Sequence, residues 1–193
     1  MSKLIAVEYM SMDGVIKEPA WTTPLWNDEH AKFQSGQLHA SRALLLGRHT
    51  YEGMSKAWLA MRFRDEFTLR MNGIPKYVAS TTLDRPEWNA AVLKGDVAQH
   101  VARLKGEPGR DLLVYGSGTL VNYLIQHNLV DELKLLVHPV VAGGGRRLFH
   151  ENTGATAWTL AGTSVFSSGD VVLDYRPTSP PLHTGTNAHP GPR

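Results

Sequence analysis

The sequence of 193 residues contains no cysteine. This absence excludes disulfide bonds, thiolate nucleophiles and cysteine-ligated metal sites together. An excess of one charge is also missing, because 20 lysines and arginines stand against 18 aspartates and glutamates. The basic residues are scattered along the chain, so we expect no basic patch of the kind that binds nucleic acid.

Long apolar runs are missing as well. None approaches the ~20 residues of a membrane-spanning helix. The apolar stretch that starts at Leu4 meets Glu8 too early to form the core of a signal peptide. We therefore expect a cytoplasmic protein with no membrane partner. A hydrophobic content of 42% is ordinary for a soluble chain that buries one core.

Short apolar segments and helical patterns alternate along most of the chain. We expect strands at 4–10, 43–47, 76–80, 90–93, 111–116 and 133–137, and helices at 27–41, 50–58, 97–104 and 120–125. The charged, unpatterned segment 61–73 is expected to be a surface excursion. Residues 159–175 are expected to form a hairpin around a Ser-Gly-Asp turn.

This order of elements predicts an α/β fold. Strands that alternate with helices form a mainly parallel central sheet with flanking helices, and the last strands add an antiparallel edge strand at the C-terminal end. One domain is expected over residues 1–176. Residues 177–193 contain five prolines and little to bury, so we expect a disordered tail there.

Glycine turns follow two of the buried strands, as Gly47–Thr50 and Gly116–Thr119. Ligands bind outside the carboxyl ends of parallel strands, where glycine allows close approach and free helix N–H groups attract anions. Arg48 adds a bidentate partner for a phosphate, and Ala79–Thr82 ends a third strand with three hydroxyls. Each segment alone also fits an ordinary turn, and Val121 stands where the Rossmann fingerprint needs its third glycine.

Taken together, the segments resemble the dihydrofolate reductase family. The similarity is strongest to the branch with the reductase domain of riboflavin biosynthesis, the C-terminal domain of the bifunctional deaminase-reductase. It covers Lys3 to about Arg176 and rests on "GRHTYE" and "VYGSGTLVNYLI", with "SMDGVI", "VAST" and "HPVVAGGGRRLF" in support. The resemblance implies a three-layer dihydrofolate reductase-like fold, NADPH as cofactor and a homodimer.

The resemblance also implies which residues bind NADPH. Arg48 matches the basic residue beside the adenosine 2′-phosphate, and His49 with Thr50 matches the helix start at the pyrophosphate. Ser80 and Thr81 match the hydroxyls at the adenosine end. The glycine turns supply the remaining cofactor residues: Gly47, Gly116, Ser117, Gly118 and Thr119.

Three acids are candidates for the catalytic carboxylate that faces the substrate. Glu29 lies four residues before Phe33, as the acid of dihydrofolate reductases does, whereas Asp13 in "SMDG" resembles the acidic position of the riboflavin branch. Asp28 is the third candidate. The competing interpretations remain open, because acids at a helix start are favoured by the macrodipole and an Asp before Gly forms turns.

Aromatic and basic side chains complete the substrate side. Trp21 and Trp26, with Phe33, are expected to bind the substrate, although the two tryptophans also fit a role as loop anchors. Arg146 or Arg147 fits an anionic substrate group, but we favour a glycine-rich turn with solvated arginines.

The sequence therefore predicts an NADPH-dependent reductase that transfers a hydride to a heterocyclic small molecule. Either a dihydrofolate-like pterin or a 5-amino-6-(5-phosphoribosylamino)uracil-like pyrimidine fits. The alternative is a non-catalytic NADPH-binding protein with the same fold. A serine hydrolase is excluded because Tyr115 stands where the nucleophile elbow needs glycine. The nine histidines show no HExxH spacing, so we expect no metal.

Overall fold

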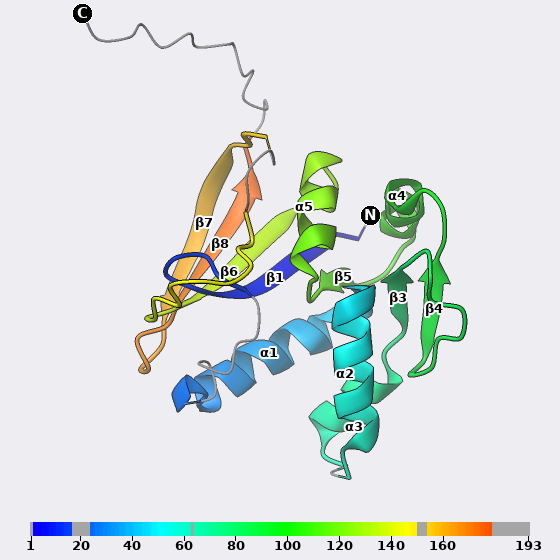
Figure 1. The fold of residues 1–193 in the computed structure, drawn as a ribbon, viewed down its shortest axis with the longest axis horizontal. Helices are drawn as coiled ribbons and strands as arrows, with labels where there is room; N and C mark the ends of the chain where they lie inside the picture. Colours follow the sequence, from blue (N-terminus) through cyan, green and yellow to red (C-terminus); the bar gives the residue numbers. More distant parts are fainter. Residues whose placement is uncertain (1, 17–23, 63, 150–153, 179–193) are drawn as a thin grey trace, which may run out of the picture.

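The computed structural model describes residues 2–16, 24–62, 64–149 and 154–178. Helices and strands alternate up to β6, except that α3 follows α2 and β4 follows β3, and β7 and β8 then form a hairpin (Figure 1). The strands are β1 (Leu4–Ser11), β2 (Ser41–Gly47), β3 (Lys76–Ala79), β4 (Ala90–Leu93), β5 (Asp111–Val114), β6 (Glu132–His138), β7 (Trp158–Val165) and β8 (Val171–Pro177). The helices are α1 (Asp28–Ala40), α2 (Arg48–Ala60), α3 (Glu66–Gly73), α4 (Val97–Gly106) and α5 (Gly118–Gln126).

The described strands form one eight-stranded sheet in the order β4-β3-β2-β5-β1-β6-β8-β7. The pairs from β4 to β6 are all parallel, whereas β8 is antiparallel to both β6 and β7. The predicted α/β fold with a mainly parallel sheet and an antiparallel C-terminal end is confirmed. The innermost strand is β1, which lies between β5 and β6.

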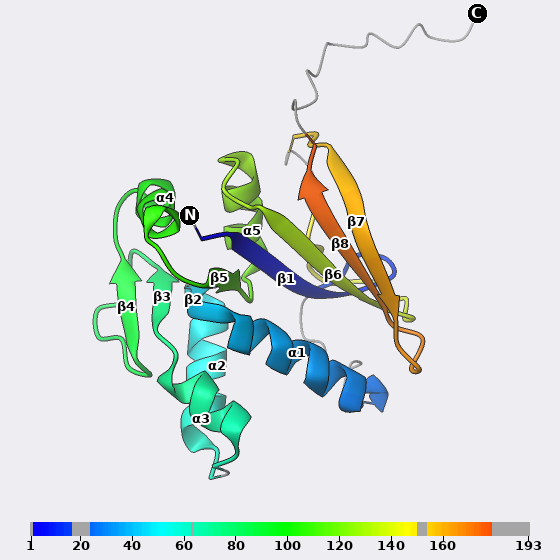
Figure 2. The same cartoon turned by 180° about the vertical axis from the view of Figure 1, so that it is seen from behind.

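Helices cover both faces of the sheet, which gives three layers (Figure 2). Leu4 and Ala6 of β1 point into the core beneath α4 and α5, whereas Ile5 and Val7 point into the core beneath α1, α2 and α3. This alternation follows from the two-residue period of a strand. Both faces of the central strands are buried, which explains why the sequence showed apolar runs without alternation.

The expectation of a surface excursion at 61–73 is wrong, because α3 occupies Glu66–Gly73. Asp65 caps this helix through the N–H of Thr68 at 2.7 Å, and Met71 is fully buried. At the other end, Lys76 Nζ donates to the carbonyls of Met71 and Asn72 at 2.6 and 3.0 Å. A helix of eight residues is too short to show a clear apolar period, so no helical signal was visible in the sequence.

The helix starts agree with the sequence to within two residues. Asn27 is the N-cap of α1, and its side chain accepts from the N–H groups of Glu29 and His30. α2 begins at Arg48, two residues earlier than expected. The longest described helices have 13 residues, and among the described residues no helix has the length and apolar character to span a membrane.

The C-terminal strand reaches slightly beyond the expected domain end at 176. Pro177 belongs to β8, and the N–H of Thr178 donates to the carbonyl of Ala157 at 3.0 Å. Residues 179–193, where the tail was expected, lie outside the described part of the chain. The division into a domain and a disordered tail stays a prediction.

Candidate functional site

The carboxyl ends of β2, β3, β4 and β5 border one cavity of about 530 Å³, which we call the strand-end groove. Four segments line it, one after each of these strands. They are Gly47–His49, Ala79–Thr82, Leu93 with Gly95, and Ser117 with Thr119. The structure thus brings together the segments that the sequence predicted to bind the cofactor, as expected for the carboxyl edge of a parallel sheet.

Two helices, α2 and α5, begin at this groove. Their N-cap residues, Gly47 and Ser117, make no side-chain capping hydrogen bond. The first N–H groups of a helix have no partner within the helix, and they carry the positive end of its dipole. Both helix starts therefore offer donors to an anion in the groove.

Glycine allows the two turns to touch. The N–H of Gly47 donates to the carbonyl of Gly116 at 3.0 Å. A Cβ atom at position 47 would lie 2.4 Å from Ser117 Oγ and 3.1 Å from its backbone nitrogen, closer than any side chain tolerates. Gly116 has φ +87°, in the region that favours glycine, and the Gly116–Ser117 peptide bond is cis.

Two side chains at the rim of the groove already have partners in the chain. Arg48 Nη1 donates to Glu52 Oε1 at 3.0 Å, which holds the guanidinium over the first turn of α2. Ser80 Oγ accepts from the N–H groups of Thr82 and Leu83 at 3.2 and 3.0 Å, which fixes the turn after β3. Both side chains are therefore positioned before any ligand arrives.

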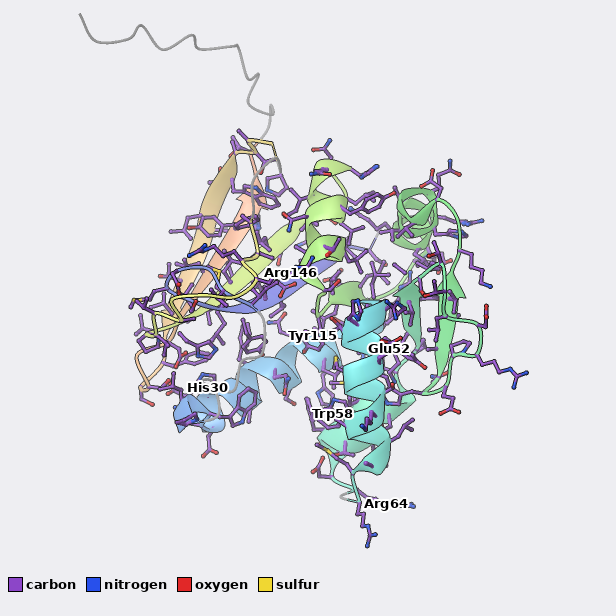
Figure 3. All side chains as sticks on the ribbon, in the orientation of Figure 1. His30, Glu52, Trp58, Arg64, Tyr115 and Arg146 are labelled. Atoms are coloured by element: carbon purple, nitrogen blue, oxygen red, sulfur yellow. The ribbon has the colours of Figure 1, made fainter. Side chains whose placement is uncertain are left out.

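A second cavity of about 650 Å³, the inner cavity, adjoins the groove and shares His49, Ser117 and Arg146 with it. Three further predicted residues, Thr50, Gly116 and Gly118, line the inner cavity. Figure 3 shows Tyr115 and Arg146 close to where α2 and α5 begin. The two cavities form a continuous space that suits a two-part ligand or two adjacent ligands.

Glu8 projects from the central strand β1 into the wall of the inner cavity. Its residue surface is only 7% exposed, and its Oε1 atom has no hydrogen-bond partner among the described residues. Burial raises the pKa of Glu8 from its ordinary value of 4.5 to about 8, so the carboxyl is largely protonated at neutral pH. A buried acid without a partner on a cavity wall is a typical feature of functional sites.

Two tyrosines contribute to the low polarity around Glu8. Burial raises the pKa values of Tyr9 and Tyr115, and both residues line the inner cavity. Tyr115 Oη donates to the carbonyl of Gln34 at 3.4 Å. The cavity therefore combines a neutral acid with two neutral phenols.

Asp13 lies outside both cavities. Its carboxylate accepts from Ser11 Oγ at 2.6 Å and from the N–H groups of Ala142 and Gly143 at 2.9 and 3.0 Å. The Ser11 hydroxyl, with these backbone groups, lowers the pKa of Asp13 to about 2. This placement shows a carboxylate that holds two loops together, and it does not favour the expected catalytic role.

The acids at the start of α1 do not line the cavities either. Glu29 accepts hydrogen bonds from the hydroxyl and the N–H of Ser167, which lower its pKa. Asp28 is exposed in the first turn. Both contacts of Glu29 join α1 to the β7–β8 turn.

The expected substrate-binding aromatics lie elsewhere. Trp26 stacks on His30 at a centroid distance of 5.2 Å and lines a separate cavity of about 540 Å³ beside Trp58. Phe33 packs edge-on against Phe166 in the core. Trp21 lies outside the described residues. None of the described aromatics expected at the substrate borders the inner cavity.

The two arginines of the glycine-rich turn have different positions. Arg146 lines both cavities and donates to Thr119 Oγ1. Arg147 donates to the carbonyl of Asp13 at 2.8 Å, outside the cavities. We expected a solvated turn for both arginines. Arg146 is exposed, and its side chain also lies at the mouth of the two cavities.

Solved structures share this fold. A putative riboflavin biosynthesis protein from Shewanella sp. PV-4 is 19% identical, with a TM-score of 0.74 over 91% of this chain and 99% of the other. Dihydrofolate reductase from Enterococcus faecalis, complexed with NADP(H), is 15% identical with a TM-score of 0.62 over 91% and 96%. The Thermotoga maritima deaminase/5-amino-6-(5-phosphoribosylamino)uracil reductase is 13% identical with a TM-score of 0.65, over 92% of this chain and 57% of the other. The predicted dihydrofolate reductase-like fold is confirmed.

Sequence relatives come from Bacillus subtilis (strain 168). The uncharacterized protein YyaP is 36% identical over 100 residues, which span about half of either protein, 52% of this chain and 53% of YyaP. The uncharacterized protein YwjB is 30% identical over 132 residues, 68% of this chain and 71% of YwjB. The family model of the RibD C-terminal domain matches residues 2–172. The chain therefore belongs to the RibD C-terminal domain family.

Proposed function

We propose that the protein is an NADPH-dependent reductase that transfers a hydride to a heterocyclic substrate. The observation that carries this proposal is the junction of the strand-end groove, bordered by two uncapped helix starts, with an inner cavity that contains a buried acid. In support, the chain belongs to the RibD C-terminal domain family, one solved structure of the same fold is a deaminase/reductase, and another is a complex with NADP(H).

The groove fits a dinucleotide phosphate. Arg48 would bind the 2′-phosphate, and the starts of α2 and α5 would bind the pyrophosphate through backbone N–H groups. Ser80 and Thr81 would border the adenosine. Glycine at 47 and 116 allows the turns after β2 and β5 to approach each other beside the two cavities. When bound, NADPH supplies the hydride.

In the inner cavity, we propose that Glu8 acts as the acid. Hydride addition to the carbon of a C=N or C=O bond leaves the nitrogen or oxygen to take up one proton. Glu8 holds a proton at neutral pH and lies on the rigid central strand, so it can donate that proton to the heteroatom and recover one from solvent. Arg146, at the mouth, would bind an anionic group of the substrate.

Two substrate classes fit, a dihydrofolate-like pterin and a 5-amino-6-(5-phosphoribosylamino)uracil-like pyrimidine. The position of Arg146 favours the second, because a ribose phosphate needs a cation and the arginine is the basic residue common to both cavities besides His49. An assay with both substrates, following oxidation of NADPH, separates them. Binding of NADPH without turnover of either would instead support the non-catalytic alternative.

The first experiment is a fluorescence titration with NADPH and with NADH. We expect Arg48→Ala to weaken NADPH binding roughly 10- to 100-fold, the value of a charge-assisted hydrogen bond, and to leave NADH binding unchanged. Arg64→Ala is the matched control, since Arg64 is exposed and points away from the groove (Figure 3). Equal losses for both nucleotides in Arg48→Ala would overturn the role of Arg48.

The acid is tested by three parallel variants. We expect Glu8→Gln to lower turnover roughly 10²- to 10⁴-fold with NADPH affinity nearly unchanged. Asp13→Asn and Glu29→Gln serve as matched controls, because both carboxylates are bonded to loops away from the cavity. Full activity of Glu8→Gln, with loss of turnover in either control variant, would return the catalytic role to the acids that the sequence predicted.

The homodimer implied by the family resemblance and the cytoplasmic location stay predictions. Sedimentation of the purified chain tests the first. An exposed edge strand, β7, with Leu160 and Val165 on its surface, is the described element best suited to a contact between copies.

A further inference from the structure

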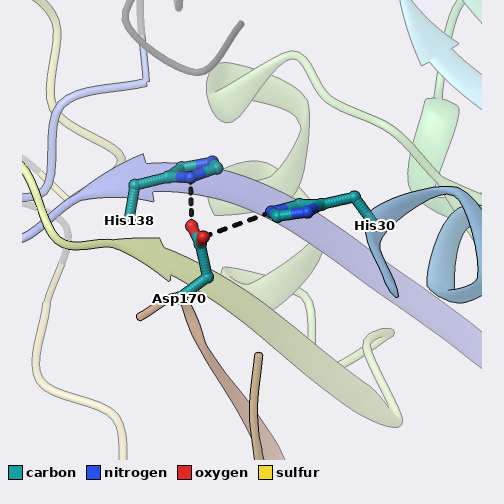
Figure 4. A group of neighbouring side chains, drawn as sticks. All are labelled: His30, His138 and Asp170. Atoms are coloured by element: carbon teal, nitrogen blue, oxygen red, sulfur yellow. Dashed lines mark ion pairs between the residues drawn. The ribbon is translucent and has the colours of Figure 1, made fainter. Parts of the chain in front are cut away.

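Away from both cavities, three polar side chains meet in the interior. His30 comes from the first turn of α1, His138 from the end of β6, and Asp170 from the turn before β8 (Figure 4). All three are fully buried. His30 Nε2 lies 3.3 Å from Asp170 Oδ2, and His138 Nδ1 contacts Asp170 Oδ1. The two imidazole rings are nearly parallel, at 4°, with centroids 5.9 Å apart.

The contacts inside this cluster are ion pairs, and they leave two of its atoms without a hydrogen bond of ordinary geometry. Neither His30 Nε2 nor Asp170 Oδ1 makes such a hydrogen bond to any described residue. A buried carboxylate and a buried imidazole each lose their hydration, and native interiors almost always restore it through partners. One potential ligand atom from each residue lies within 4.8 Å of the other two. The potential ligand atoms of the three residues therefore converge on one small volume.

We propose that His30, His138 and Asp170 form a binding site for a divalent transition-metal ion, with Zn²⁺ as the best match. Two imidazole nitrogens and one carboxylate oxygen are ligands that zinc prefers. Zinc bonds of about 2.1 Å in a tetrahedral arrangement place neighbouring ligand atoms roughly 3.4 Å apart. The separation of His30 Nε2 and Asp170 Oδ2, 3.3 Å, agrees with that spacing.

The surroundings of the cluster resemble the outer shell of a metal site. His30 Nδ1 lies 2.8 Å from Asn27 Oδ1 and 3.3 Å from the Asn27 backbone nitrogen; in the tautomer with its proton on Nδ1, the ring donates to Oδ1 and Nε2 faces the ion. Ser168 Oγ donates to Asp170 Oδ2 and orients the carboxylate. Trp26 and Phe166 pack on His30 with centroid distances of 5.2 and 5.0 Å, which makes the shell apolar.

The position of the site favours a structural role. The three ligands come from α1, β6 and the β7–β8 turn, so one ion would join the antiparallel end of the sheet to the helix layer. Residues 30, 138 and 170 are far apart in the sequence. The expectation of no metal, which rested on local histidine spacing, could not address such a site.

The test uses the full chain without a histidine tag and needs neither cofactor nor substrate, so its failure is separate from failure of the reductase proposal. After chelation and dialysis, Co²⁺ is added and its visible absorption is recorded. Thermal unfolding is then measured with and without Zn²⁺. We expect about one ion per chain, the absorption bands of tetrahedral Co²⁺, and a midpoint raised by roughly 5–10 °C when free Zn²⁺ is about 100 times its Kd.

Variants separate a ligand effect from a folding effect. His30→Gln and Asp170→Asn should abolish the Co²⁺ bands and the Zn²⁺ shift, whereas His127→Ala, at an exposed histidine, should keep both. Asn27→Ala should weaken Zn²⁺ binding roughly 10- to 100-fold by removing the partner of His30 Nδ1. Its matched control is Asp96→Ala, which removes the cap of α4 and leaves the cluster intact.

Wild-type protein that shows no tetrahedral Co²⁺ bands and no Zn²⁺ shift would overturn the proposal. The cluster would then be a set of buried ion pairs that holds no metal. A Zn²⁺ shift of equal size in wild type and Asp170→Asn would also overturn it, because the ion would bind elsewhere on the surface.

Discussion

The five helix starts of this fold differ in how their free N–H groups are satisfied. Asn27 and Asp65 cap α1 and α3 with their side chains, and Asp96 does the same for α4 beside the groove. In contrast, α2 and α5 begin at Gly47 and Ser117 without such a bond. The starts of α2 and α5 are thus left to an external partner in the groove, whereas the other three are satisfied within the chain.

Two buried ionisable residues show the same contrast. Lys76, 1% exposed, donates to two carbonyls at the end of α3 and lies 4.1 Å from the ring centroid of Trp88. Glu8, 7% exposed, has Oε1 without a hydrogen-bond partner in the described part of the structure. Burial lowers the pKa of Lys76 to about 7 and raises the pKa of Glu8 to about 8, so it disfavours the charged form of both, but only Lys76 has its polar atom bonded by the chain. This difference indicates that the fold gives up stability at the wall of the inner cavity, where a ligand would bind.

The largest expected effect concerns the acid. The folded-state pKa of Glu8, about 8, exceeds its ordinary value of 4.5, so the folded chain holds a proton that the unfolded chain releases. Its contribution to the free energy of unfolding therefore falls as pH rises from about 4.5 to 8, by at most ~5 kcal/mol. We expect Glu8→Gln to remove this slope in urea unfolding measured at several pH values.

Asp13 provides the opposite case for this measurement. Its pKa is lowered to about 2, so its contribution is complete at neutral pH and is lost only as pH falls toward that value. Asp13→Asn should therefore leave the slope between pH 5 and 8 as in the wild type. An unchanged slope in Glu8→Gln would show that Glu8 is not the source of the pH dependence of stability, and the contrast with Lys76 would fail.

A smaller effect is expected where the two uncapped helix starts touch. Gly47→Ala places a methyl group against Ser117, and we expect a loss of about 1–3 kcal/mol in the free energy of unfolding together with weaker NADPH binding. Gly36→Ala is the matched control, because nothing lies within 4 Å of a Cβ at this helical position. It should stabilise the protein by up to about 1 kcal/mol. Similar effects of the two substitutions would contradict the close approach.

The smallest effects compare the caps directly. Asp65→Ala removes the hydrogen bond to the N–H of Thr68 and should cost about 1 kcal/mol of stability without changing NADPH affinity. Ser117→Ala removes no capping bond and should cost less stability, but it should weaken NADPH binding. Chemical denaturation and nucleotide titration of both variants would decide. A reversed order would erase the distinction between the two classes of helix start.

Much of the fold and of the groove was predictable from the sequence. Runs such as Leu44–Leu46 identify strands buried on both faces, and their alternation with helices determines a parallel sheet. Once the strands are parallel, their carboxyl ends share one edge, so Gly47 and Ser117 had to lie near each other. The position of the groove therefore follows from the order of the strands and helices and from the pattern of apolar residues.

The acid and the histidine cluster were not predictable in the same way. The sequence places Glu8 inside an apolar strand, but only the folded structure shows that it lines a cavity together with Gly116 and Thr50. His30 and Asp170 meet because α1 docks beside β6 and the β7–β8 turn, and no local spacing encodes that docking. Likewise, only the path of the loop in the folded chain shows that Arg146 lines the cavities whereas Arg147 binds the carbonyl of Asp13.

The position of β1 has a consequence for protein engineering. Glu8 lies on the innermost strand, hydrogen-bonded on both sides, whereas Arg146 lies on an exposed turn. A laboratory selection for new substrates should therefore collect substitutions and insertions around Arg146 and leave β1 untouched. The exposed turn around Arg146 and the buried strand β1 can evolve at different rates. Glu8 would then serve many substrates that differ only in the group that reaches Arg146.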